Sequence, residues 1–537
     1  MKKTDAFRRA AALMAALSIT VSLAAPAFAG TYYIDDGDII ITKDENGRQT
    51  VKRSESDTSE IEDNGEIIIT TREQTITTQE SDLEGPAAED TGFGPVVEEN
   101  YQPAQPESAE EPKSADRQES AEEQESAGPQ PQQAAPAAAP AASTPVNKKE
   151  NGFWGNTITV INNFANKALK LTLKDVKIDV SHTGTENYIN PEAGKAALSV
   201  QGDGNVEIEL DGKNELKSGH FRAGLEKIIS AGTLTLKDDN QKAGSLTATG
   251  GSYSAGIGGS YWGSGENITI NGGTVTATGS YYGAGIGGGE QGNGKNITIN
   301  GGTVNAKGGS QGAGIGGGSD GSGENITINS GTVTAAGGSY GAGIGGGYWG
   351  DYKSGNGGKD ITINGGTVNA TGGYLGAGIG GGGIGMYDGY TNGENITING
   401  GTVTATGGDR GAGIGGGSGS VSIGSGGGGY GSGKDITING GTVIAAGGKE
   451  AAGIGGGDSG SSENITITGG TVTVKGGEFG AGIGGGRDGS GETITINDGT
   501  VTAAGGSLGA GIGGGESGSG SNVTVSGAAQ EIGRAHV

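Results

Sequence analysis

Short runs of alternating apolar and polar residues dominate the second half of the chain. Residues 266–289 read ENITINGGTVTATGSYYGAGIGGG, in which Ile268–Ile270 and Thr274–Thr278 each alternate with a period of two. This period is typical of β-strands with one buried face, and the intervening Asn-Gly-Gly is typical of a tight turn. We therefore predict three short strands in this unit, with an inward-facing set of Ile268, Ile270, Val275, Ala277, Ala284 and Ile286.

The same unit is repeated down the chain. The isoleucine of each Gly-Ile-Gly-Gly stands at 257, 286, 315, 344, 379, 414, 454, 483 and 512, so most units span 29 residues and three are longer. Six buried side chains supply roughly 9–18 kcal/mol at ~1.5–3 kcal/mol each, whereas ordering the unit costs ~1–2 kcal/mol per residue. No unit folds alone, and stacking units into a parallel β-helix is the arrangement that pairs all of their strands.

Charged residues provide an internal test of stacking, because stacked units place matching residues about 4.8 Å apart. The residue before the first strand changes sign at every step but the last: Glu266, Lys295, Glu324, Lys359, Glu394, Lys434, Glu463 and Glu492. A second column alternates as Asp409, Lys449 and Glu478, and Arg410 is expected to lie against Glu450.

Asparagine recurs in the turn between the first two strands of most units. We expect this column to form a hydrogen-bonded ladder and to tolerate left-handed backbone geometry. Its members are Asn271, Asn300, Asn329, Asn364, Asn399 and Asn439.

The N-terminal part of the chain has a different composition. Residues 1–29 carry a basic start, an apolar run and Ala-Phe-Ala, which predicts a cleaved signal peptide and export. Residues 30–85 form an acidic segment with two short β repeats, and 86–147 a disordered linker that holds ten of the twelve prolines. Residues 148–250 are expected to form irregular first coils, 251–531 the regular repeats, and 532–537 a sequencing-adapter scar at a truncated C-terminus.

Charge and cysteine content exclude some classes of function. The net charge is −26, and residues 30–147 hold 27 acidic against 7 basic residues, so nucleic acid is not an expected partner. No cysteine is present, which leaves stability to burial and backbone pairing. No transmembrane segment is expected in the mature chain, which we place outside the cell, at the surface or in the cell wall.

The alternation of Ala-Gly-Ile-Gly-Gly-Gly with Ile-Thr-Ile-Asn-Gly-Gly-Thr-Val resembles the glycine-rich β-helix surface proteins of gut-dwelling Gram-positive bacteria. The match covers residues 195–530. The chain is also similar to pectate-lyase-like right-handed β-helices and to their calcium-dependent polysaccharide-binding relatives. The resemblance implies an all-β, right-handed parallel β-helix of about 29 residues per coil, but it does not select one activity, because many activities share this fold.

Three consecutive units carry insertions on one side of the predicted β-helix, after Gly-Ile-Gly-Gly. Exposed aromatic rings there are expected to stack on sugar rings, and the loops also suggest a calcium site with Asp351 or Asp388 as ligand; no other cofactor is expected. The predicted carbohydrate-binding residues are Tyr261, Trp262, Tyr348, Trp349, Tyr352, Tyr387, Tyr390 and Tyr430.

These patterns favour an exported, non-catalytic protein that binds extracellular polysaccharide or glycoprotein glycans. P-loop-like and Gly-x-Gly-x-x-Gly matches arise from the repeat and lack the surrounding βαβ unit, so they predict no nucleotide site. The alternatives are a purely structural shaft that displays a missing C-terminal module, a pectate-lyase-like enzyme, and ice binding through outward threonine rows. The cluster of Asp409, Arg410, Lys449 and Glu450 is the best acid–base candidate, and charge stacking explains it more simply.

Overall fold

The structure is a computed structural model that describes residues 30–54, 56–72, 152–186, 191–228, 230–240, 242–350, 357–385, 389–419, 430–526 and 530–532. The predicted signal peptide, the linker 86–147 and most of the predicted adapter scar lie outside these residues. The described residues contain one 3₁₀ helix, η1 (Ile34–Asp36), and no α-helix.

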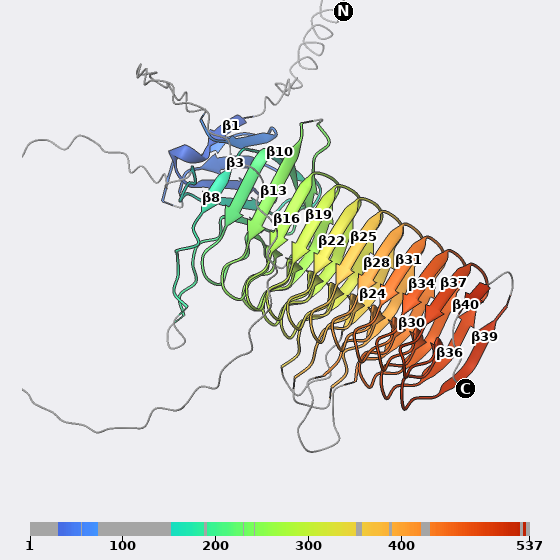
Figure 1. Cartoon of the computed structure of the whole chain (residues 1–537). Helices are drawn as coiled ribbons and strands as arrows, with labels where there is room; N and C mark the ends of the chain where they lie inside the picture. The colour runs from blue at the N-terminus through green and yellow to red at the C-terminus, as the bar shows by residue number, and fades with distance from the viewer. Residues whose placement is uncertain are drawn as a thin grey trace, which may run out of the picture. The chain divides into compact units, whose positions relative to one another are not determined.

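Parallel strands stack coil upon coil along most of the molecule (Figure 1). We call one turn of the chain a coil; it runs from the turn before one Thr-Val strand to the next such turn and has an Ile–Gly strand at its centre. Each regular coil contributes one strand to each of three parallel ladders, which confirms the predicted all-β, right-handed parallel β-helix.

The first ladder contains the Ile-Thr-Ile strands. Its members are β1 (Gly30–Tyr33), β5 (Ile67–Thr70), β7 (Leu169–Lys174), β10 (Val206–Lys217), β12 (Leu234–Lys237), β15 (Gly265–Ile270), β18 (Gly294–Ile299), β21 (Gly323–Ile328), β24 (Gly358–Ile363), β27 (Gly393–Ile398), β30 (Gly433–Ile438), β33 (Ser462–Ile467), β36 (Gly491–Ile496) and β39 (Gly520–Val525).

The second ladder contains the Thr-Val strands. Its members are β8 (Lys177–Asp179), the second half of β10, β13 (Gly244–Thr249), β16 (Thr274–Thr278), β19 (Thr303–Lys307), β22 (Thr332–Ala336), β25 (Thr367–Thr371), β28 (Thr402–Thr406), β31 (Thr442–Ala446), β34 (Thr471–Lys475), β37 (Thr500–Ala504) and β40 (Gln530–Ile532).

The third ladder contains the short Ile-Gly strands and begins with longer strands. Its parallel members are β2 (Ile39–Lys43), β6 (Ile158–Asn162), β9 (Leu198–Gln201), β11 (Leu225–Lys227), β14 (Ile257–Gly258), β17 (Ile286–Gly287), β20 (Ile315–Gly316), β23 (Ile344–Gly345), β26 (Ile379–Gly380), β29 (Ile414–Gly415), β32 (Ile454–Gly455), β35 (Ile483–Gly484) and β38 (Ile512–Gly513). At its N-terminal end β3 (Gln49–Lys52) pairs antiparallel with β2, and β4 (Ile61–Glu62) pairs antiparallel with β3.

The core is a column of aliphatic side chains enclosed by the three ladders. All six residues of the predicted inward set, Ile268, Ile270, Val275, Ala277, Ala284 and Ile286, are 0% exposed. All of them except Ala284 belong to one continuous cluster together with their counterparts in the neighbouring coils. The apolar faces of successive units are therefore buried together in one core.

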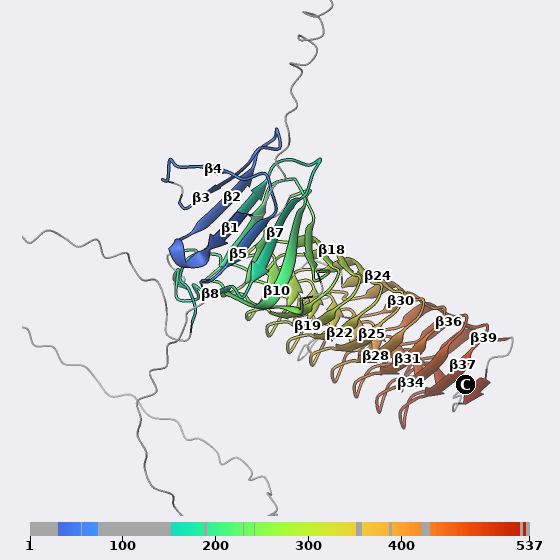
Figure 2. The same cartoon turned by 90° about the horizontal axis from the view of Figure 1, so that it is seen from above.

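Residues 30–72 belong to this β-helix and not to a separate segment. The sequence predicted two short strands there, and both are present, as β2 and β5. Strand β2 pairs in parallel with β6, and β5 pairs in parallel with β7, although a long stretch of chain separates the partners. Figure 2 shows these strands at the N-terminal end, where they cover the first coils.

The predicted asparagine ladder is present, but its backbone geometry differs from the expectation. Asn300 donates from Nδ2 to Oδ1 of Asn271 at 2.8 Å, and the same bond recurs at each step to Asn439. In the Asn-Gly-Gly turn the left-handed residue is the second glycine, for example Gly273 at φ +79°. The left-handed asparagines form another column that begins at Asn267, φ +57°.

That second column bends the first-ladder strand of each coil. Asn267 is skipped in the register between Glu266↔Lys295 and Ile268↔Ile297, so the bend separates the outward charge from the inward isoleucine. Its other members are Asn296, Asn325, Asp360, Asn395, Asp435, Asn464, Thr493 and Asn522, all with φ between 51° and 59°. Thr493 alone is β-branched, and a β-branched residue is strained in this region.

Replacing Thr493 by asparagine is therefore expected to stabilise the last coils by about 1 kcal/mol. The amide would relieve the strain and extend the column in which Asn464 donates to Asp435 at 2.6 Å. Denaturant unfolding followed by circular dichroism measures the change. The matched control is Thr495→Asn, two residues further along the same strand at an ordinary β position, which should give no gain. Equal effects of the two substitutions would refute the strain argument.

Candidate functional site

Two turns flank each Ile-Gly strand, and together they form one side of the β-helix that we call the loop edge. The pre-strand turn of one coil contacts the post-strand turn of the next through backbone hydrogen bonds. Tyr348 N–H donates to the Gln311 carbonyl and Asp458 N–H donates to the Arg410 carbonyl, both at 2.8 Å. Side chains from successive coils therefore lie in columns along this edge.

Aromatic rings fill these columns in the first regular coils. Tyr253 stacks on Phe221 at 5.4 Å and on Tyr282 at 5.1 Å between ring centroids, with interplanar angles of 11° and 6°. Tyr261 packs against Phe221 at 5.1 Å. Because both faces of Tyr253 are covered by other rings, this stack stabilises adjacent coils and leaves that ring no free face for a sugar.

The structure places three of the predicted binding residues in different environments on this edge. Trp262 stacks on Tyr261 at 4.6 Å and keeps 63% of its surface exposed. Tyr348 is half-buried against Tyr340 at 5.1 Å, and burial raises the pKa of its hydroxyl. Trp349 is also half-buried, and its backbone bridges to Ile384 in the next coil. Of these residues, Trp262 has the most accessible ring.

We call the part of the loop edge that carries the insertions after Gly-Ile-Gly-Gly the ridge, and its described residues pair between adjacent coils. Tyr390 and Tyr430 form a parallel bridge between adjacent coils, and both side chains are exposed. The remaining predicted residues, Tyr352 and Tyr387 for sugar and Asp351 and Asp388 for calcium, lie outside the described residues. Among the residues that the structure describes, no group of three or more His, Asp or Glu is arranged to hold a metal ion.

Sequence reasoning missed a groove that lies beside the aromatic stack. The groove has a volume of about 540 Å³ and is bounded by exposed Tyr281. It is lined by the glycine pairs of two successive coils, Gly308–Gly309 and Gly337–Gly338, by Gly279 and Gly373, and by Ser310 and Ser339. Tyr374, which is 49% exposed, follows Ser339 in the same column, next to the groove residue Gly373. The repeat carried the signal, because this one position reads Tyr, Ser, Ser, Tyr in successive coils.

The paired glycines set the depth of the groove. A Cβ atom on Gly309 would overlap the carbonyl oxygen of Ser280, and one on Gly338 would overlap that of Gly309. Only glycine permits coils to approach this closely at that turn. The two serines between the tyrosines then leave room that larger side chains fill in other coils.

The predicted charge columns are in register. Glu266 pairs with Lys295, and each later member pairs with the next through Glu463 and Glu492. Ion pairs of 3.7 Å join Lys295 to Glu324 and Lys434 to Glu463. Lys449 lies 3.8 Å from Glu478 in the second column. Because these pairs are exposed, each contributes little to stability.

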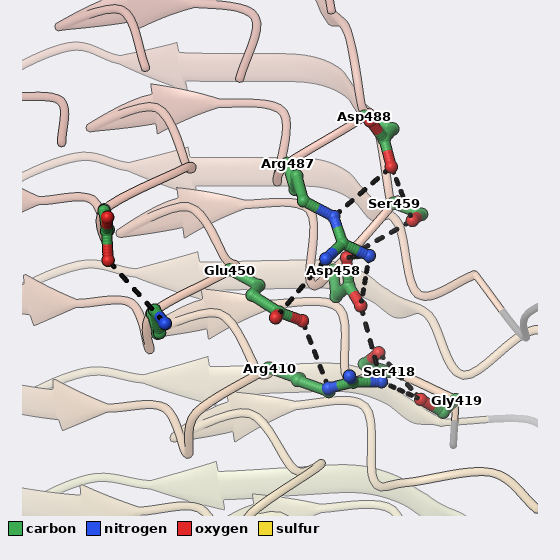
Figure 3. A network of polar contacts seen from close by, with 10 residues as sticks. Arg410, Ser418, Gly419, Glu450, Asp458, Ser459, Arg487 and Asp488 are labelled. Atoms are coloured by element: carbon green, nitrogen blue, oxygen red, sulfur yellow. Dashed lines mark hydrogen bonds and ion pairs between the residues drawn. The ribbon is translucent and has the colours of Figure 1, made fainter. Parts of the chain in front are cut away.

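A denser ionic network continues the loop edge beyond Tyr374 (Figure 3). Arg410 contacts Glu450 at 3.1 Å, as predicted, and Asp458 at 3.6 Å. Arg487, from the next coil, contacts the same two carboxylates at 3.3 Å and 3.0 Å. The network therefore joins three coils. The sequence analysis missed Asp458 and Arg487, which come from post-strand turns that it did not align with Arg410.

The Asp458 carboxyl has unusual electrostatics within this network. Burial raises its pKa to about 6, the neighbouring Glu450 carboxylate adds to the rise, and the two guanidinium groups oppose it. A carboxyl of this kind can exchange a proton near neutral pH. Both carboxylates are held between two guanidinium groups, which is the arrangement of a clamp between coils.

Comparison with known proteins agrees with this architecture. A family model described as a beta helix repeat matches nine segments: residues 242–261, 268–290, 297–319, 326–348, 361–383, 396–418, 436–458, 465–487 and 494–516. No curated protein and no solved structure matches the chain. The fold and the nine matches together define a β-helix repeat protein. The described residues include no helix long and apolar enough to cross a membrane.

Proposed function

We propose that this β-helix repeat protein is exported and binds extracellular carbohydrate at its loop edge without catalysing a reaction. The resemblance to glycine-rich surface proteins of gut bacteria and the predicted signal peptide support an extracellular setting at the cell surface or in the cell wall. Polysaccharide or glycoprotein glycans are the proposed ligands, with the β-helix as a rigid support.

The observation that carries the proposal is the groove between Tyr281 and Tyr374. A sugar ring has an apolar C–H face and a rim of hydroxyl groups, so it fits a flat aromatic ring beside polar groups. Tyr281 and Tyr374 expose such rings, and the serine hydroxyls between them offer hydrogen-bond partners. The two tyrosines are three coils apart, roughly 14 Å at the usual strand spacing, which suits a short oligosaccharide.

A glycan array probed with the mature chain tests the proposal. We expect the Tyr281→Ala/Tyr374→Ala variant to lose at least about tenfold in affinity, because each aromatic platform contributes about 0.5–1.5 kcal/mol beyond its area. The Tyr390→Ala/Tyr430→Ala variant tests the originally predicted ridge in the same assay. Leu508→Ala, which removes another exposed apolar side chain from the loop edge, is the matched control and should bind as wild type does.

Each outcome of this assay separates the hypotheses. Loss of binding only in the Tyr390/Tyr430 variant would move the site from the groove to the ridge. Failure of the wild-type chain to bind any glycan would overturn the proposal and leave the structural shaft. Release of shortened or unsaturated sugars from a bound polysaccharide would show a pectate-lyase-like enzyme instead. Circular dichroism melts of all variants would confirm that each is folded.

A further inference from the structure

We propose that the groove between Tyr281 and Tyr374 selects acidic oligosaccharides, with Lys307 binding the carboxylate of the sugar. This inference rests on the proposed function and specifies its ligand. The chain carries a net charge of −26, yet the groove is lined by one charged residue, and that residue is a lysine. A cationic groove on an acidic protein favours a ligand that supplies the missing negative charge.

Among the residues that the structure describes, Lys307 has no carboxylate partner. It is the last residue of β19, its side chain is exposed, and no described carboxylate lies within 4.0 Å of its ammonium group. Its neighbours in the second ladder are Thr278 on one side and Ala336 on the other, both uncharged. By contrast, the lysines of the first-ladder charge column each face glutamates in register. Lys307 is therefore available to a ligand.

The position of Lys307 relative to Tyr281 also supports its proposed role in binding a sugar carboxylate. Its coil is the one directly after the coil of Tyr281, since Gln311 N–H donates to the Tyr281 carbonyl at 2.9 Å. Thr278, Ser280 and Ser310 line the groove around it and offer hydroxyl groups. A sugar ring over Tyr281 would place a carboxylate substituent toward Lys307, while its hydroxyl groups face the serines.

Another cation, Arg410, lies beyond the groove next to Tyr374 and is already neutralised within the protein. The Arg410 guanidinium lies 5.9 Å from the centre of the Tyr374 ring, where it holds that ring in place. It also pairs with Glu450 and Asp458, so it brings no unbalanced charge to the groove. Selectivity for acidic sugars is therefore assigned to Lys307, and Tyr374 contributes a stacking surface.

The test compares matched ligands and matched lysines in the mature chain. The ligands are oligosaccharides that carry sialic acid or a hexuronic acid, each presented beside its own methyl ester, which has the same ring but no charge. The variants are Lys307→Gln and Lys475→Gln. Lys475 ends β34 at the equivalent position five coils away and lies outside the groove. Binding is measured at low and at physiological salt.

We expect wild type to bind the acids at least about tenfold more tightly than the esters, because a hydrogen bond to a charged group is stronger than one to a neutral ester. Lys307→Gln should abolish this preference and the salt dependence, and Lys475→Gln should preserve both. If Lys307→Gln keeps the preference, or if wild type binds acids and esters equally, the inference fails while the proposed function stands. If neither form binds, both fail.

Discussion

Replacing Gly408 by alanine is expected to destabilise the β-helix by about 3 kcal/mol or more, whereas replacing Gly400 in the same coil should change stability by less than about 1 kcal/mol. A Cβ atom on Gly408 would overlap the backbone carbonyl oxygen of Gly373 in the preceding coil. Backbone on both sides leaves no flexible side chain to move aside, so the coils would have to separate. The equivalent atom on Gly400 would lie 3.1 Å from one oxygen, that of Asn364.

Thermal and denaturant unfolding of the two variants, followed by circular dichroism, measures the difference. Limited proteolysis is expected to cleave the Gly408→Ala chain near its altered coil, because stability in a stacked-coil protein is a sum of local and nearest-neighbour terms. The prediction would be wrong if Gly408→Ala and Gly400→Ala unfolded together. That result would mean that the glycines supply only turn flexibility, and not close approach between coils.

The repeat made much of the fold predictable because each coil repeats the same pattern of inward and outward residues. The inward set from Ile268 to Ile286, the asparagine ladder from Asn271 and the contact between Arg410 and Glu450 were all predicted and are all present. One-dimensional stacking converts a sequence spacing directly into a spatial column. A contact between coils is therefore readable without knowing the rest of the fold.

Contacts outside the repeat were not predictable in this way. Local alternation identified β2 and β5 as strands, but it contains no information about partners far along the chain. Those partners are fixed by specific bonds, such as the Asn156 side-chain amide to the Ile34 carbonyl at 2.8 Å and Thr157 N–H to the Asp38 carboxylate at 2.7 Å. The alternation correctly predicted β2 and β5 as strands, but only the structure shows which strands they pair with.

Two features of the structure could not be predicted from the spacing of the repeat alone. Two asparagine columns, those of Asn271 and Asn267, had equal intrinsic freedom to adopt left-handed geometry, and only the bend in the strand selects the second. The groove arises because two coils carry a serine where the coils of Tyr281 and Tyr374 carry a large side chain. Clustered aromatic residues in the sequence indicate the ridge, but they do not indicate a groove formed by small residues.

The ionic network provides the second large prediction, which concerns pH. Burial and Glu450 raise the pKa of Asp458 from 3.8 to about 6, so the folded protein holds this proton more tightly than the unfolded chain does. Between about pH 4 and pH 6 the folded state therefore keeps a proton on Asp458 that the unfolded chain has released. Because the folded state binds more protons in this range, the free energy of unfolding falls as pH rises. The Asp458→Asn variant mimics the protonated form and does not titrate there.

We therefore expect Asp458→Asn to match wild type near pH 4 and to exceed its stability by ~3 kcal/mol at pH 7. Denaturant unfolding of both proteins at several pH values between 4 and 7 measures the difference. Ser418→Ala, which changes a neutral member of the same network, should give an offset that does not vary with pH (Figure 3). A variant less stable than wild type at pH 7 would show that attraction to Arg410 and Arg487 outweighs burial and the Glu450 charge. In that case the network is a net source of stability at neutral pH, and the pKa of the Asp458 carboxyl is lowered and not raised.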